Sequence, residues 1–345
     1  MAYLFILAGL VLLFVGGEVL VRGSVGIARR FGLSELLIGI VLVGFGTSMP
    51  ELVTSLQAVG QGAVGMSVGN VTGSNIANVM LVLGTAALIR PIFTDPKALS
   101  RDFIFMVFAT IVFLCLAYFD LFTRAVGIVL VALLLIYIVG SFLLDKKNAD
   151  TAALHTDEGE LIEANDALWL SCALAVAGVA GVVIGANLLV NGGVTVATRF
   201  GVSDTLIGLS IVAIGTSLPE LATSIVSAFK GKSDVALGNV IGSNIFNVLG
   251  IIGVTTIFLP FSLNDPNNSV QAADSAEFGA VFSREASSLA SNLTWTDVST
   301  LILSVFFVIL FAFSGKRLAR WEGATLLAGY ILFLGLAFNL IPSFS

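Results

Sequence analysis

Ten apolar runs, each long enough to cross a lipid bilayer, constrain this chain more than any other feature. Only 11% of the residues are charged, whereas soluble domains carry about 25%. Membrane β-strands would alternate apolar and polar residues, but residues 126–144 are apolar on every face. We therefore predict an all-α membrane protein with ten transmembrane helices. A hydrocarbon core of about 30 Å takes roughly 20 helical residues, and the expected spans lie near 3–22, 35–59, 64–89, 103–120, 125–144, 167–190, 204–228, 233–259, 298–314 and 324–342.

The lysines and arginines are distributed unevenly over the connecting loops. With ten spans, 13 of the 16 fall on one side of the membrane, and three (Arg124, Arg199 and Arg284) fall on the other. Because cytoplasmic loops carry the excess of basic residues, both termini are predicted to be extracytoplasmic and the loop 145–166 cytoplasmic. Nothing basic precedes the first span, which we therefore read as a retained helix and not as a signal peptide.

The sequence contains an internal repeat. With an offset of 169 residues, Leu20–Gly84 aligns with Leu189–Gly253 without a gap, and 32 of the 65 pairs are identical. Each copy has five spans, an odd number, so the second copy must cross in the opposite sense. We predict two inverted five-helix repeats, 1–145 and 167–345, joined by a short cytoplasmic linker at 146–166. The second repeat carries an extra polar loop at 262–297, expected outside the membrane.

Each repeat places one glutamate well inside an apolar span. Glu51 and Glu220 occupy equivalent positions, and a carboxylate at the centre of a membrane helix costs at least about 2.5 kcal/mol. The alternative, a buried ion pair, is disfavoured because no Lys or Arg lies deep within an expected span. Glu18 has no acidic counterpart in the second copy and is read as an ordinary partner of Arg22. Glu51 and Glu220 are thus predicted to bind a cation.

The residues around each glutamate supply further oxygen atoms. Pro50 and Pro219 precede the glutamates, and a proline inside a helix leaves the carbonyl four residues back without its donor. Hard cations such as Ca²⁺ and Na⁺ prefer carbonyl and carboxylate oxygens. Hydroxyl and amide side chains recur at helical spacing in both copies, and the candidate ligands among them are Thr47, Ser48, Ser74, Asn78, Thr216, Ser217, Ser243 and Asn247.

Other polar and small residues of these blocks are read as structural. Asn70, Asn75, Asn239 and Asn244 are expected to brace the backbone or to line the path. The glycine pairs Gly69 with Gly73 and Gly238 with Gly242 would let helices approach closely.

Two repeated blocks carry a resemblance to a known family. Gly46-Thr47-Ser48-Met49-Pro50-Glu51 returns as Gly215-Thr216-Ser217-Leu218-Pro219-Glu220, and Gly69–Asn78 returns as Gly238–Asn247. These blocks resemble the alpha repeats of the calcium/cation antiporter superfamily, in its sodium/calcium exchanger-like prokaryotic branch. The resemblance covers about 65 residues in each half directly.

The resemblance implies a function and a ligand set. It implies an antiporter that exchanges Ca²⁺ for Na⁺ in a prokaryotic inner membrane, with Glu51 and Glu220 as shared central ligands of Ca²⁺. Thr47, Ser48, Ser74, Thr216, Ser217 and Ser243 would contribute to flanking Na⁺ sites, the carbonyls of Gly44 and Ala213 would also serve, and Asn78 and Asn247 would lie at the centre. Several exchangers have Asp where this chain has Asn247, and in the potassium-dependent branch that Asp is tied to K⁺ co-transport, so we expect transport without K⁺.

Three other functions remain open from the sequence. A Ca²⁺/H⁺ antiporter of the same superfamily would bind protons at the two glutamates, but hydroxyl-rich positions suit Na⁺ better. An intramembrane hydrolase needs a base to activate its serine, and the only histidine, His155, lies in the linker. A cation channel is disfavoured by the paired motifs. We expect no enzymatic activity, no cofactor apart from the transported ions, no nucleic acid and no obligate protein partner.

Overall fold

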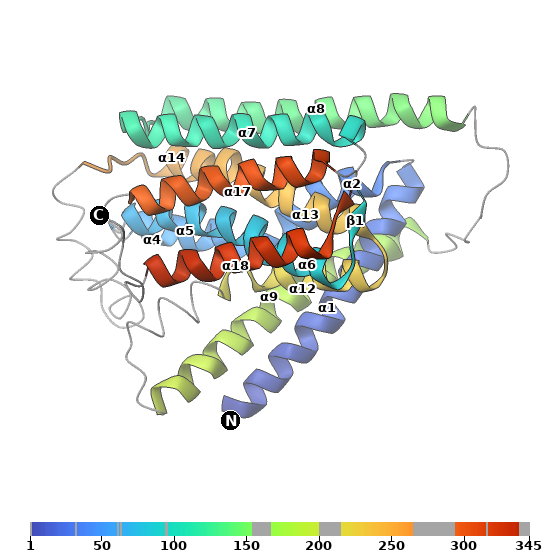
Figure 1. The fold of residues 1–345 in the computed structure, drawn as a ribbon, viewed down its shortest axis with the longest axis horizontal. Coiled ribbons are helices and arrows are strands. Elements are labelled where there is room, and N and C mark those ends of the chain that lie inside the picture. The colour runs from blue at the N-terminus through green and yellow to red at the C-terminus, as the bar shows by residue number, and fades with distance from the viewer. Residues whose placement is uncertain are drawn as a thin grey trace.

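The computed structural model describes residues 2–31, 33–60, 62, 64–93, 96–153, 167–199, 215–264, 294–314 and 317–337. Nearly all of these residues are helical (Figure 1). The elements are α1 (Ala2–Phe31), α2 (Glu35–Ile38), η1 (Gly39–Gly44), α3 (Phe45–Thr47), α4 (Met49–Gly60), α5 (Val64–Ala77), η2 (Asn78–Leu83), α6 (Gly84–Ile89), β1 (Ile92–Phe93), α7 (Pro96–Phe119), α8 (Arg124–Ala153), α9 (Leu168–Arg199), α12 (Leu218–Phe229), α13 (Ser233–Ile245), η4 (Phe246–Ile252), α14 (Gly253–Phe258), α17 (Trp295–Ser314), β2 (Arg317–Leu318) and α18 (Arg320–Ala337).

Seven helices in the described ranges are long and apolar enough to cross a membrane. The segments Glu35–Thr47 and Met49–Gly60, bent by 43° at their junction, would make an eighth if the pair crosses as one span. A helix occupies at least part of each of the ten expected ranges, although the start of the seventh, 204–214, lies outside the described residues. Ten spans therefore remain a prediction. The seven are Ala2–Phe31, Val64–Ile89, Ser100–Phe119, Arg124–Asp145, Leu168–Gly193, Ser233–Phe258 and Trp295–Phe313.

Several helices run past the bounds expected from hydropathy. Helix α1 continues to Phe31 and α8 continues to Ala153, which makes 146–153 of the expected linker helical. Hydropathy locates only the part of a helix that lipid surrounds, and a helix that leaves the hydrocarbon can continue in water. Of the loop expected at 262–297, residues 265–293 lie outside the described part of the chain, and α17 already begins at Trp295.

Two helices with repeat-equivalent sequences form the centre of the fold. The segments α5–η2–α6 and α13–η4–α14 are the most buried spans, at 72% and 89% of their apolar windows, whereas α1 and α9 are buried over 33% and 28%. In Figure 1, α7 and α8 run along one edge, and α1 and α9 extend away from the opposite side. Both copies of the block that begins at Gly69 and at Gly238 therefore lie inside the bundle.

Helices α1 and α9 pack against each other through glycines seven residues apart. A Cβ at Gly9 would meet the Leu189 nitrogen at 2.6 Å, and one at Gly16 would meet the Val182 nitrogen at 2.8 Å. At Gly23 the carbonyl of Ser171 would lie 2.7 Å away. The partner number falls as the α1 number rises, so the two repeat-equivalent helices are antiparallel. Small residues at such contacts let helix backbones approach closely.

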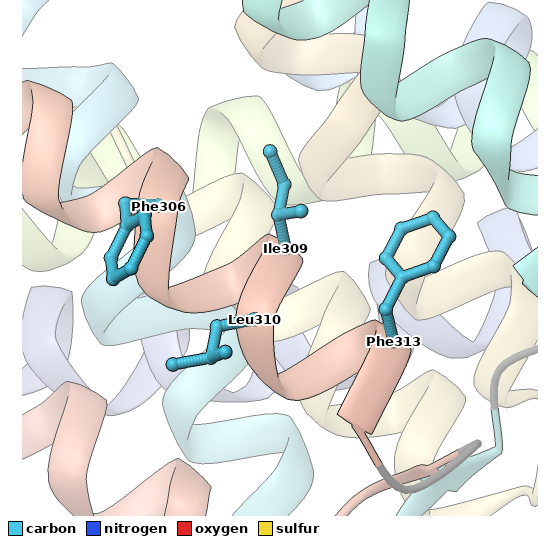
Figure 2. A pocket seen from close by; sticks show the side chains of 4 residues that line it. All are labelled: Phe306, Ile309, Leu310 and Phe313. Carbon is cyan, nitrogen blue, oxygen red and sulfur yellow. The ribbon is translucent and has the colours of Figure 1, made fainter.

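The outer surface of the bundle is apolar, as lipid contact requires. Large exposed side chains line α1, α7, α8 and α17. The three tryptophans, Trp169, Trp295 and Trp321, are 64–84% exposed and lie in the first turn of α9, α17 and α18, which is where aromatic residues meet the membrane interface. A groove of about 430 Å³ lies on α17. Figure 2 shows the side chains that line it, which are Phe306, Ile309, Leu310 and Phe313. None of the described lining residues is polar, and none is a predicted ligand.

Short polar contacts hold the ends of the helices. Strands β1 and β2 pair antiparallel, with Ile92 opposite Leu318. At the α7–α8 turn, Asp120 accepts hydrogen bonds from Ser262 and from the backbone of Leu263. Glu18 pairs with Lys230 at 2.9 Å. Lys230 is an additional partner, beside Arg22, that the sequence did not predict; it reaches Glu18 because α1 packs beside the end of α12.

Candidate cation-binding site

The helix that carries Glu51 is broken immediately before the glutamate. The π-helical η1 leads into α3, and Ser48 leaves helical geometry at φ −86° and ψ 10° before α4 starts at Met49. The second half repeats this arrangement, with Ser217 at φ −87° and ψ 5° before α12. A proline at the second position of each new helix explains the interruption, because it cannot donate to the preceding turn. The break expected from the sequence is confirmed.

Two carboxylates lie at these breaks with no cationic partner among the described residues. Glu51 and Glu220 are 1% and 0% exposed. Among the described residues the other buried acids are Asp102, paired with Arg101, and Glu322, which accepts from the Ala319 nitrogen. No buried Lys or Arg occurs in the described ranges. A charge of this kind requires a bound cation or a proton for compensation.

Hydrogen bonds join the first break to the second half of the chain. The Ser48 hydroxyl donates to Glu220 Oε1 at 2.9 Å, and the Ser243 hydroxyl donates to the Gly44 carbonyl at 3.1 Å. Thr47 Oγ1 contacts Asn239 Oδ1 at 3.2 Å. A Cβ at Gly44 would meet the Ser243 nitrogen at 2.8 Å, so η1 and α13 pack backbone to backbone. Predicted ligands of both halves therefore meet in one place.

Two asparagines brace the glutamate-bearing helices in the same way. Asn70 Nδ2 donates to the Glu51 carbonyl at 3.2 Å and to Ser55 Oγ at 3.0 Å. Asn239 Nδ2 donates to the Glu220 carbonyl at 3.1 Å and to Ser224 Oγ at 2.8 Å. The two sets are related by the offset of 169 residues. The expectation that these asparagines brace the backbone is confirmed.

Four further asparagines form a cluster between the two central helices. Asn78 Nδ2 donates to Asn244 Oδ1 at 3.1 Å, and Asn247 Nδ2 donates to Asn75 Oδ1 at 3.0 Å. Asn75 Nδ2 and Asn244 Nδ2 each donate to the other's carbonyl, at 3.5 and 3.4 Å. Every one of these bonds joins the first half to the second.

Unpaired buried oxygens mark the same region. A buried acceptor without a donor costs about 1–3 kcal/mol. Among the described residues, every buried carboxylate or amide oxygen that lacks a partner belongs to the predicted ligands; the remaining unpaired atoms are hydroxyls, including that of Ser217. Oxygen ligands with no donor are suited to a hard cation. The carboxylate and amide atoms are Glu51 Oε2, Glu220 Oε2, Asn78 Oδ1 and Asn247 Oδ1.

The remaining predicted residues are placed less fully. Ser74 is buried on α5 and Thr216 is half-buried before α12. Ala213 lies outside the described residues. Gly238 and Gly242 pack against η1 as expected, but no described atom lies within 4 Å of a Cβ built at Gly69 or Gly73. By the offset of 169 residues, the segment expected to pack against Gly69 and Gly73 is 208–213, the counterpart of η1, and it also lies outside the described residues.

Three features of the site region were not predicted. The π-helical segments η2 and η4 begin at or next to Asn78 and Asn247, and such segments are frequent at functional sites. Ser55 and Ser224 accept from the bracing asparagines; their identity in both repeats, four residues after each glutamate, was a signal available in the sequence. Buried Asp102 accepts from Tyr137 at 2.9 Å, and no sequence pattern linked these two residues.

Comparison with known proteins identifies the family. A family model described as "Sodium/calcium exchanger protein" matches residues 1–143 and 170–339. The chain is 32% identical to the sodium/calcium exchanger MaX1 of Methanosarcina acetivorans, over 97% of this chain and 98% of that protein. It is 31% identical to the inner membrane protein YrbG of Escherichia coli, over 98% and 97%.

A solved structure gives the same result. The sodium-calcium exchanger NCX_Mj, soaked with 10 mM Na⁺ and zero Ca²⁺, superposes with a TM-score of 0.74 at 32% identity, over 97% of this chain and 98% of that chain. Matches of this extent include both motif-bearing halves. This integral membrane protein therefore belongs to the sodium/calcium exchanger family.

Proposed function

We propose that this protein is a secondary active antiporter that exchanges Ca²⁺ for Na⁺ by alternating access. The observation that carries the proposal is the pair of buried carboxylates, each with an unpaired oxygen and without a described cationic partner. Two carboxylates give the site a charge of minus two, which one Ca²⁺ or two Na⁺ would neutralise. Competition of the two ions for the same charge is a sufficient basis for exchange.

The proposed ligand set combines these carboxylates with neutral oxygens. Hydroxyl, amide and carbonyl oxygens are suitable ligands for Na⁺ and Ca²⁺, and the buried hydroxyl of Ser217 has no partner. A proton would need no such shell of oxygens, so the shell favours Na⁺ over H⁺ as the counter-ion. The proposed neutral ligands are Thr47, Ser48, Ser74, Asn78, Thr216, Ser217, Ser243 and Asn247, with the carbonyls of Gly44 and Ala213.

The proposed architecture has ten spans in two inverted five-helix repeats, which place an ion site where the repeats meet. The antiparallel contact of α1 with its repeat counterpart α9 supports inversion, and the matched bracing of Glu51 and Glu220 supports the repeat. The distribution of basic residues supports extracytoplasmic termini and a cytoplasmic linker. The relation to an inner membrane protein supports a prokaryotic inner membrane.

Flux in proteoliposomes tests the proposal. Protein reconstituted with internal Na⁺ is diluted into Na⁺-free buffer, and uptake of ⁴⁵Ca²⁺ is measured with and without K⁺. We expect uptake that needs the outward Na⁺ gradient, does not need K⁺ and disappears in Glu51→Gln and Glu220→Gln. Glu18→Gln is the matched control, because that carboxylate pairs with Lys230 on the outside of the bundle, and its uptake should persist.

Each alternative predicts a different result in this assay. Uptake that ignores Na⁺ but follows an imposed pH gradient would identify a proton antiporter. Uptake that follows the Ca²⁺ gradient alone would identify a channel. Loss of uptake in K⁺-free buffer would refute the expectation of K⁺ independence.

A further inference from the structure

The asparagine cluster, formed by Asn75, Asn78, Asn244 and Asn247, sets the direction of two ion ligands. A carboxamide has a donor end and an acceptor end, and only the acceptor end can bind a cation. Asn78 and Asn247 are buried, with each Nδ2 donating across the molecule and each Oδ1 unpaired. The direction of both amides is therefore fixed by whatever holds the Nδ2 atoms.

The Nδ2 atoms are held by Asn244 and Asn75. Asn247 Nδ2 donates to Asn75 Oδ1 at 3.0 Å. Reversal of the Asn75 amide would break a second hydrogen bond, because its Nδ2 donates to the Asn244 carbonyl. The same holds for Asn244, which accepts from Asn78 and donates to the Asn75 carbonyl and toward Met106 Sδ. Each amide in the cluster thus fixes the next one.

We propose that Asn75 and Asn244 are positioning residues that hold the amide oxygens of Asn247 and Asn78 toward the transported cation. The proposal rests on the cation transport proposed above and assigns a role to two residues outside the ligand set. Without Asn75, the Asn247 side chain loses the acceptor that selects its direction, and a reversed amide would present N–H donors to a cation. The substitution should therefore weaken Ca²⁺ binding without removal of a ligand.

The substitution Asn247→Asp distinguishes a positioning role of Asn75 from a role in packing alone. Aspartate has an oxygen at both ends and needs no selection of direction. Asn75→Leu should therefore weaken Ca²⁺ binding in the Asn247 background and have little effect in the Asn247→Asp background. A residue that only filled space would cause the same loss in both backgrounds.

The experiment is a double-mutant cycle on the KM for Ca²⁺ of Na⁺-driven uptake in proteoliposomes. We expect Asn75→Leu to raise this KM roughly fivefold or more, as the loss of one orienting hydrogen bond implies, and to raise it less than about twofold when Asn247→Asp is present. Asn70→Leu is the control, because Asn70 braces Glu51 and does not touch Asn247; its effect should be equal in both backgrounds. The cycle of Asn244→Leu with Asn78→Asp repeats the test and replaces it if Asn75→Leu does not fold.

The outcomes distinguish this inference from the proposed function. Absence of Na⁺-driven uptake in the unsubstituted protein would overturn the antiporter and with it the positioning role. Normal uptake with equal effects of Asn75→Leu in both backgrounds, or no effect in either, would overturn the positioning role alone.

Discussion

Replacement of Tyr137 by Phe tests a buried contact that hydropathy does not reveal. Tyr137 on α8 is 4% exposed, and its hydroxyl donates to Asp102 Oδ1 on α7 at 2.9 Å. Asp102 is fully buried, and Arg101 binds both of its oxygens, at 2.8 and 3.0 Å. The phenylalanine ring keeps the stacking contact with Phe105, whose centroid lies 4.3 Å away. Only the hydroxyl is removed.

The expected loss in the free energy of unfolding follows from the charge of Asp102, which accepts the Tyr137 hydrogen bond. Removal of a hydrogen bond to a charged group costs about 1.5–3 kcal/mol in proteins, and polar contacts between membrane helices reach about 1.7 kcal/mol in measured cycles. The two ranges overlap between about 1.5 and 1.7 kcal/mol, which is the loss that we expect for Tyr137→Phe. That corresponds to a change of roughly 10- to 20-fold in the unfolding equilibrium.

Thermal or denaturant unfolding in a mild detergent measures this loss. Tyr330→Phe is the matched control, because Tyr330 is 6% exposed and contacts Phe333 through its ring, without a hydrogen-bond partner for its hydroxyl in the described part of the chain. It should change stability by less than about 0.5 kcal/mol. In a cycle with Asp102→Asn, most of the loss should appear as coupling between the two positions. Equal effects of the two tyrosine substitutions would refute the reasoning.

Two further predictions concern helix contacts and pH. Gly16→Ala should destabilise the protein by about 1–3 kcal/mol, because the added Cβ would meet backbone atoms of α9 at 2.8 and 2.9 Å. Gly140→Ala is the control, because no described atom lies within 4 Å of its Cβ, and it should leave the melting temperature unchanged or raised. The same change in melting temperature for both variants would contradict the packing argument. Burial raises the pKa of Asp120, but hydrogen bonds from Ser262, Leu263 and Asn264 outweigh it and hold the pKa below its ordinary value. Its stabilising contribution is therefore complete above about pH 4 and is lost as the pH falls through the lowered pKa. The protection of residues 262–264 against hydrogen exchange, taken relative to the intrinsic exchange rate at each pH, should fall in acid. Asp120→Asn should remove this acid dependence, whereas Asp297→Asn, at the start of α17, should not; an unchanged acid response in Asp120→Asn would refute the assignment.

Much of the candidate site was predictable because both repeats place the same polar residues around a glutamate in an apolar run. A carboxylate in an apolar run needs compensation wherever it lies, and the repeat identified Glu51 and Glu220 together with their hydroxyl and amide neighbours. The prolines before them predicted the breaks that the structure has at Ser48 and Ser217. The role of Asn70 and Asn239 as braces also followed from their place in the repeated block.

The sequence by itself determined the membrane class, the repeat and the candidate cation ligands, because hydropathy, periodicity and charge are local properties of a chain. Only the tertiary structure decided which groups face each other. Glu18 pairs with Lys230, and Asp102 with Tyr137, and neither pairing could be predicted because both depend on which helices pack together. The directions of the Asn78 and Asn247 amides likewise depend on asparagines of the opposite half. Contacts between residues about 170 positions apart arise only when the two halves pack against each other, and no local pattern predicts which end of an amide will then donate across that contact.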